Sequence, residues 1–240
     1  MRSGNPTLRN ETFTQVAPIG STEVMTIQGT VNKTFVLLLL VLFTASLVWR
    51  DPVSMLPWLG IGAIGGFITA MVTVFKKQWA PVSAPIYALL EGLVLGGISA
   101  LFERSYPGIV MQAVALTFGT LAALLIAYKS RLIQATENFK LGVFAATGGI
   151  FLVYLVSWIM SFFGASIPMI HQSGALGIGF SVFVVIIAAL NLVIDFDFIE
   201  KGAESGAPRY MEWYGAFGLM VTLIWLYLEI LRLLAKLRER

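Results

Sequence analysis

The stretch that decides the fold runs from Leu176 to Asp195 and reads LGIGFSVFVVIIAALNLVID. It contains no charged residue before its last position, Asp195. About 20 consecutive apolar residues, wound as an α-helix, are needed to cross the hydrocarbon core of a bilayer. This stretch therefore predicts a helix that spans a membrane.

Six further stretches have a similar length and composition, so the sequence predicts an all-α polytopic membrane protein with seven transmembrane helices. The approximate boundaries are 33–49, 54–75, 82–102, 107–128, 141–163, 173–195 and 213–235. Short polar loops separate them, and the longest internal loop is expected at 197–212. We expect one membrane domain at 31–240, preceded by a polar cytoplasmic tail at 1–30.

The composition supports this interpretation and excludes several classes of protein. Of the 240 residues, 58% are hydrophobic and 12% are charged, whereas an ordinary soluble domain has roughly 25% charged residues. Cys is absent and His171 is the single histidine, which excludes thiolate and His-rich metal sites. No zinc-protease motif, P-loop or nucleophile elbow occurs. We therefore expect no enzyme and no cofactor, and no metal site is certain.

The Lys and Arg residues predict the orientation, because they are enriched in cytoplasmic loops. Their place between apolar stretches also argues against nucleic-acid binding, despite the net charge of +3. A cytoplasmic N-terminus puts ten of the 16 Lys and Arg residues on that side, including Lys76, Lys77 and Lys129. If the seventh stretch were re-entrant, four more at the C-terminus would join them, so the charge rule alone slightly favours a re-entrant segment.

Pairs of glycines inside the stretches indicate how the helices pack. Gly62 and Gly66, and likewise Gly92 and Gly96, are four residues apart, and Gly148 is followed by Gly149. Small residues let helix backbones approach closely in lipid, so tight packing is the preferred interpretation. A hinge or a pore lining is the alternative.

Ionisable residues within a span are costly and usually functional. Glu91 lies near the middle of the third stretch, where a lone carboxyl is expected to be protonated or paired. It is either a neutral side chain that is hydrogen-bonded to a neighbouring helix or a proton or cation site. We keep it as a candidate for an ion path.

The end of the sixth stretch carries two acids, Asp195 and Asp197. Because they are two residues apart, their side chains point about 200° apart on a helix. Asn191 precedes Asp195 by four residues and shares its face, so these two form a polar stripe that runs into the membrane. Asp197 precedes Lys201 by four residues, which is the favoured order for an ion pair. Asp195 is therefore the candidate that points inward, and Asp197 is expected at the interface.

The seventh stretch carries Glu229, and Arg232 follows within ion-pair reach. An internal pair that lets the helix end reach the interface is one explanation; a functional carboxylate is the other. No Lys precedes Lys236 in this stretch, which excludes a retinal protein, and regular arrays of gating arginines are absent, which excludes a voltage sensor.

Several segments together resemble the transmembrane Bax inhibitor motif family, in its bacterial-type branch. The resemblance covers almost the whole chain, and its C-terminal motifs are the specific ones. It is carried by IDFDFIE at 194–200, EWYGAFGL at 212–219, LYLEILR at 226–232, YALLEG at 87–92 and RSGNP at 2–6.

The resemblance implies seven helices with the last surrounded by the other six, which overrides the re-entrant alternative, in a bacterial inner membrane. It also implies a pH-sensitive calcium leak channel, with calcium and protons as partners beside the lipid bilayer. Family members are gated by two aspartates that share a hydrogen-bonded latch on the cytoplasmic side. The first matches Asp195 and the second matches Glu229.

The chain departs from the family pattern near this latch. The second acid is one methylene longer, the loop between the acids is longer, and Arg232 supplies a competing cation. If the seventh helix starts at Trp213, Glu229 lies too far along it to meet Asp195. The second span ends at Lys76 and Lys77, which are candidate basic partners of the latch.

Carboxylates supply the hard oxygen ligands that calcium prefers. When two carboxyl groups lie close together in a low dielectric, ionising both costs much free energy. Such a pair would share a proton and so respond to pH. A proton-coupled transporter with saturable flux remains an alternative. So does a non-conducting regulatory protein of quality control or stress survival, which would bind a membrane protein partner.

Overall fold

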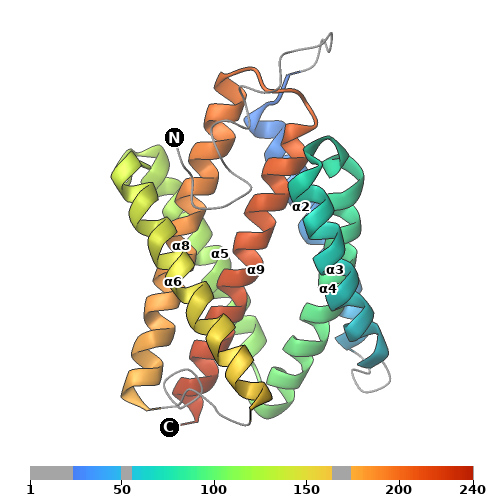
Figure 1. Ribbon diagram of the computed structural model, residues 1–240, viewed down its shortest axis with the longest axis vertical. Coiled ribbons are helices and arrows are strands. Elements are labelled where there is room, and N and C mark those ends of the chain that lie inside the picture. Colours follow the sequence, from blue (N-terminus) through green and yellow to red (C-terminus); the bar gives the residue numbers. More distant parts are fainter. Residues whose placement is uncertain (1–23, 50–55, 164–173, 240) are drawn as a thin grey trace. The chain divides into compact units, whose positions relative to one another are not determined.

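The computed structural model describes residues 24–49, 56–163 and 174–239, and nearly all of them are helical (Figure 1). Seven of its helices are long and apolar enough to span a membrane, which confirms the predicted fold class. They are α2 (Ile27–Trp49), α3 (Leu56–Phe75), α4 (Ala80–Ser105), α5 (Ile109–Lys129), α6 (Glu137–Phe162), α8 (Ala175–Glu204) and α9 (Met211–Arg238). A short 3₁₀ turn, η1 (Lys77–Trp79), joins α3 to α4. The tail before residue 24 and His171 lie outside the described residues.

Two expected boundaries are wrong. Helix α2 begins at Ile27, inside the expected polar tail, because the Thr26 hydroxyl accepts a hydrogen bond from the Gly29 backbone and so caps the first turn. Helix α8 continues nine residues past Asp195 into the expected loop. The ion pair between Asp197 and Lys201 bridges one turn of this extension.

Helix α9 is continuous over 28 residues, or about 42 Å at the rise of an α-helix. This exceeds the thickness of the hydrocarbon core, which is about 30 Å. The re-entrant seventh segment that the charge rule favoured is therefore wrong. Helix α9 is also the most buried of the seven spans, as expected for a helix that packs inside a bundle.

The chain forms two compact units that share α8 and α9. One unit contains α2, α3 and α4, together with the chain from Asp197 to Val221. The other contains α5 and α6, the part of α8 up to Phe196, and the part of α9 from Thr222. The Asp195, Asn191 and Glu229 side chains all belong to the second of these units.

In the first unit, α4 packs against α2 and α3 (Figure 1), and glycines allow the close approach. A Cβ atom at Gly96 would lie 2.5 Å from the Ala45 carbonyl oxygen, and one at Gly62 would lie 2.7 Å from the Leu90 carbonyl oxygen. Real Cβ atoms do not approach that closely. The predicted tight packing is thus confirmed for these glycines.

In the second unit, Ile150, Val184 and Ile187 form a buried cluster, against which Trp225 of α9 packs. Gly148 and Gly149 lie in the same helix as Ile150, but a Cβ atom at either would meet nothing within 4 Å. The predicted tight packing is wrong for this pair. Their helix α6 instead turns large apolar side chains such as Phe151 outward.

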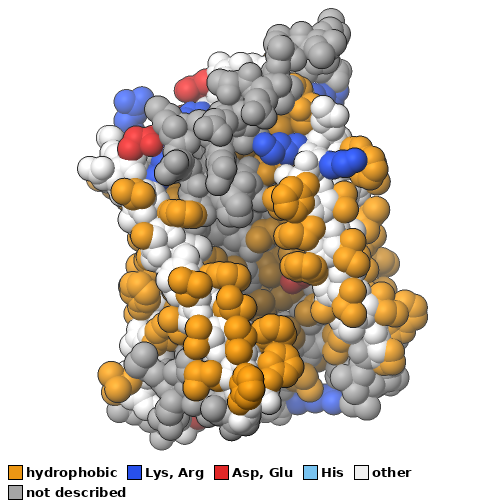
Figure 2. Space-filling model, in the orientation of Figure 1, with side chains coloured by type: hydrophobic (Ala, Val, Ile, Leu, Met, Phe, Trp, Pro, Cys, Tyr) orange, Lys and Arg blue, Asp and Glu red, His pale blue; other side chains and the backbone are white. Residues whose placement is uncertain are grey.

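Many large apolar side chains are exposed on the spanning helices, and Figure 2 shows them over much of the visible face. A soluble protein rarely exposes so much contiguous apolar surface. In a bilayer these side chains contact the acyl chains of lipids, which is the environment that the seven spans require.

Candidate functional site

The register between α8 and α9 decides which polar side chains meet. The Asp195 carboxyl group accepts a hydrogen bond from the Thr222 side chain, and Ser181 Oγ accepts one from Lys236 Nζ. Ser181 precedes Asp195 by 14 residues, and Thr222 precedes Lys236 by the same interval. The two helix segments therefore run antiparallel with matched spacing.

Asp195 is the most unusual carboxyl group of the site. Its side chain is buried, with 3% of the residue exposed. Among the described residues, its Oδ2 atom has no hydrogen-bond partner. A buried polar atom without a partner costs free energy, and more so when it is charged. The site therefore has one carboxylate oxygen that is available to a proton or a cation.

The predicted polar stripe on α8 is confirmed. Asn191 lies one turn before Asp195 and is also buried. Its amide donates to Thr147 Oγ1 of α6 at 3.0 Å and to the Ile187 carbonyl oxygen at 2.8 Å. The predicted pair between Asp197 and Lys201 is confirmed too, with 2.8 Å between Oδ2 and Nζ.

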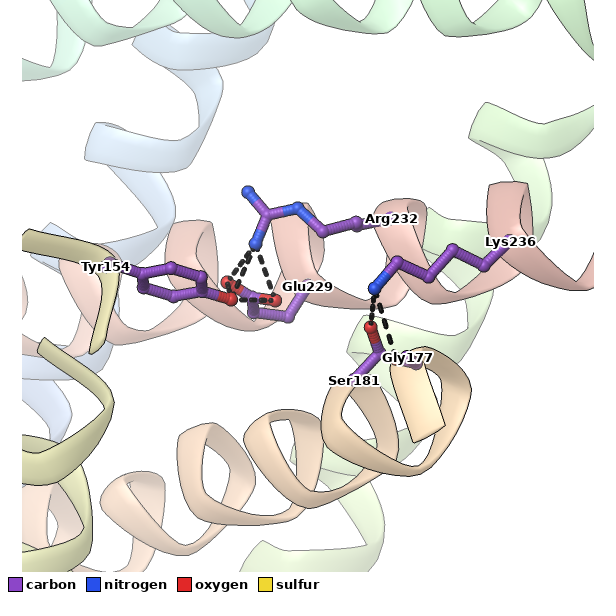
Figure 3. A network of polar contacts seen from close by, with 6 residues as sticks. All are labelled: Tyr154, Gly177, Ser181, Glu229, Arg232 and Lys236. Carbon is purple, nitrogen blue, oxygen red and sulfur yellow. Dashed lines mark hydrogen bonds and ion pairs between the residues drawn. The ribbon is translucent and has the colours of Figure 1, made fainter. Parts of the chain in front are cut away.

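Glu229 lies in a separate network, which Figure 3 shows. Arg232 Nη1 donates to both carboxylate oxygens, at 2.9 and 3.0 Å, so the internal pair, one of the two explanations of Glu229, is formed. The Tyr154 hydroxyl of α6 lies 3.1 Å from each oxygen and donates to the carboxylate. The same hydroxyl accepts from Arg232 Nη1 at 2.7 Å, and the guanidinium lies over the Tyr154 ring.

The direct latch between Asp195 and Glu229 is not formed in this structure. Thr222, which meets Asp195, precedes Glu229 by seven residues, or about 10.5 Å of helix rise. Both oxygens of Glu229 are instead bonded to Arg232 and Tyr154. Arg232 binds Glu229, and α9 begins as early as Met211. For these two reasons the Asp195–Glu229 pair that the resemblance implied does not form.

Lys236 completes a polar stripe on α9 that sequence reasoning missed. It is buried, and its Nζ atom donates to the Gly177 carbonyl oxygen at 3.1 Å and to Ser181 Oγ at 2.8 Å (Figure 3). The signal was present, because Thr222, Glu229 and Lys236 recur every seven residues. This interval returns to nearly the same face of a helix.

Glu91 is half-buried on α4, and Tyr87, one turn earlier on the same helix, is its hydrogen-bond partner. Its carboxylate also lies close to Gly66 of α3, where a Cβ atom would be 3.4 Å from Oε2. The polar partner thus comes from its own helix rather than from a neighbour. Its place in an ion path stays a prediction.

The two candidate latch lysines contact aromatic rings. Lys76 Nζ lies 4.9 Å from the centre of the Trp79 ring, and Lys77 Nζ lies 5.8 Å from that of Tyr214. Their role as basic partners of the latch stays a prediction.

An ion pair between a half-buried lysine and a buried acid in the first unit was not predicted. Glu212, in the first turn of α9, pairs with Lys33 of α2. The same carboxylate accepts hydrogen bonds from the Thr26 backbone at 2.9 Å and from the Thr26 hydroxyl at 2.8 Å. Glu212 therefore anchors the N-terminus of α2. Sequence reasoning assigned both charged residues to loops or span ends, because nothing local links residues so far apart.

Seven apolar helices with buried ionisable side chains between them define a multi-pass integral membrane protein. The family model described as Bax inhibitor 1 like matches residues 5–239, and the chain belongs to that family. No curated protein and no solved structure matches the sequence.

Proposed function

We propose that this protein is a pH-sensitive calcium leak channel of a bacterial inner membrane. Membership of the Bax inhibitor 1 like family and the seven apolar helices support this proposal. The observation that carries it is the buried Asp195, whose Oδ2 atom has no hydrogen-bond partner among the described residues. A carboxylate oxygen is a ligand that calcium accepts.

In this mechanism protons and calcium compete for Asp195. A proton neutralises the carboxyl group, which then rests against Thr222 of α9 at little electrostatic cost. Loss of the proton leaves a buried charge, which a cation or a rearrangement of α8 against α9 must compensate. The protonation state of Asp195 thereby biases the arrangement of the two helices.

Glu229 has a different part in this mechanism. Arg232 already compensates its charge, and Tyr154 connects the pair to α6. We therefore assign to Glu229 the holding of α9 against α6, and to Asp195 the sensing of protons. Asn191 and Glu91 remain candidates for the ion path.

The substitution Asp195→Asn is expected to flatten the pH dependence of calcium flux. Asn keeps the size of the side chain but cannot lose a proton in this range. The measurement is calcium flux into liposomes that contain only this protein, at a series of pH values. Asp197→Asn is the matched control, because that carboxylate is already paired with Lys201, and it should leave the profile nearly unchanged.

A second comparison separates one proton sensor from a shared one. With Asp195 and Glu229 in separate networks, the effects of Asp195→Asn and Glu229→Gln on flux should add. Non-additive effects would show that the two acids pair in another conformation. Absence of flux at every pH would contradict the channel and favour a regulatory protein, whereas saturable flux of a definite substrate would favour a transporter.

We further propose that the N-terminus is cytoplasmic. The chain has no Cys, so single introduced thiols report cleanly. A Cys at the exposed Ser130, between α5 and α6, should react with an impermeant maleimide only after permeabilisation of the cells. A Cys at the exposed Ser105, at the end of α4, should react in intact cells. The reverse pattern would overturn the orientation.

A further inference from the structure

The turn between α3 and α4, residues 75–82, exposes an unusual set of apolar side chains. Phe75 is 80% exposed, Trp79 is 57% exposed and Val82 is 67% exposed. Both helices are long and apolar enough to span a membrane, so the turn that joins them lies at a membrane surface. Tryptophan is enriched at this depth, because its ring is apolar and its N–H is polar.

The backbone of this turn holds a lysine over the exposed tryptophan. The Trp79 amide donates to the Lys76 carbonyl oxygen at 2.8 Å, and the Lys76 amide donates to the Val72 carbonyl oxygen at 2.8 Å. The Lys76 ammonium group lies 4.9 Å from the centre of the Trp79 ring. The cation is thus positioned beside an apolar surface and remains exposed.

The neighbouring lysine, Lys77, contacts the beginning of α9, which belongs to the same unit. Lys77 Nζ lies 5.8 Å from the centre of the ring of Tyr214, which is fully buried and therefore rigidly placed. In the part of the chain that the structure describes, neither Lys76 nor Lys77 forms an ion pair with an acid, whereas Lys33 of the same unit pairs with Glu212. Among the described residues, these two adjacent positive charges therefore have no acidic partner.

We propose that this turn is a binding site for the headgroup of an anionic phospholipid. Lys76 and Lys77 would donate to the lipid phosphate, Trp79 would lie at the headgroup level, and Phe75 and Val82 would contact the acyl chains. Figure 2 shows Lys and Arg side chains next to exposed hydrophobic ones at the end where α3 joins α4. A soluble anion would use the lysines but would gain nothing from the apolar side chains.

The test compares the lipids that the purified full-length protein retains from mixed micelles of phosphatidylglycerol and phosphatidylcholine. The ratio of the two retained lipids is measured by mass spectrometry. The unmodified protein should retain phosphatidylglycerol preferentially. Lys76→Gln with Lys77→Gln should reduce that preference about fivefold for each lysine removed, while Lys76→Arg with Lys77→Arg should preserve it.

A charge-matched control removes two basic residues from another turn. Lys129 and Arg131, which follow one another closely at the end of α5, are both exposed, and their double replacement by Gln should leave the ratio unchanged. If this control lost the preference for phosphatidylglycerol to the same extent, the preference would depend only on net charge. The proposed site at the turn between α3 and α4 would then be wrong. Displacement of the lipid by millimolar glycerol phosphate would also overturn it, since the site would then bind a soluble anion. Neither outcome depends on whether the protein conducts calcium.

Discussion

Replacement of Gly92 by alanine is expected to destabilise the membrane domain by about 3 kcal/mol, although it adds only one carbon atom. Gly92 faces α2, and a Cβ atom there would overlap Thr44 Oγ1 and the Val41 carbonyl oxygen, and would lie 2.9 Å from the Val41 Cα atom. A hydroxyl group can rotate away, but a helix backbone cannot. The two helices must therefore separate, and the packing along both is lost.

The control for this prediction is the same substitution at a glycine that has room. A Cβ atom at Gly119, inside α5, would meet nothing within 4 Å. Gly119→Ala should stabilise the protein by about 0.5–1 kcal/mol, because alanine has the higher helix propensity. Unfolding in mixed detergent micelles measures both changes. Equal effects of the two substitutions would contradict the close approach of α2 to α4.

The substitution Lys33→Met is expected to cost about 3–5 kcal/mol, because it leaves the buried Glu212 carboxylate without its cation. Thr26 would still donate its two hydrogen bonds to Glu212, but these do not compensate the charge. Gly29 lies directly against the same carboxylate, so the side chain has no room to turn toward solvent. The α2 N-terminus should loosen together with the start of α9.

A double variant tests this explanation. Lys33→Met combined with Glu212→Gln should recover much of the stability that Lys33→Met loses, because no unpaired charge remains and the amide oxygen still accepts from Thr26. Lys201→Met is the matched control, since its partner Asp197 is on the same helix and 39% of the Lys201 side chain is exposed. It should cost about 0.5 kcal/mol or less. If the double variant were no more stable than Lys33→Met, the ion pair would not be the reason.

The contacts within a single helix were predictable from spacing alone. The pair Asp197–Lys201 and the pair Glu229–Arg232 form because residues three or four apart lie on one face of any helix. For the same reason Asn191 shares a buried face with Asp195. The family resemblance, by contrast, implied an Asp195–Glu229 contact that the structure does not form. The resemblance singled out the two acids, but it did not predict how α8 and α9 are aligned along one another.

The sequence by itself determined the class of protein, the seven spans and these local pairs, because hydrophobic length and helical periodicity are properties of short segments. Only the tertiary structure decided which helices share a polar contact. Tyr154 meets Glu229 and Ser181 meets Lys236 across long intervals of chain. These contacts depend on how α6, α8 and α9 are set along one another. This alignment results from side-chain packing along the whole length of the helices. It therefore cannot be predicted from a short sequence pattern.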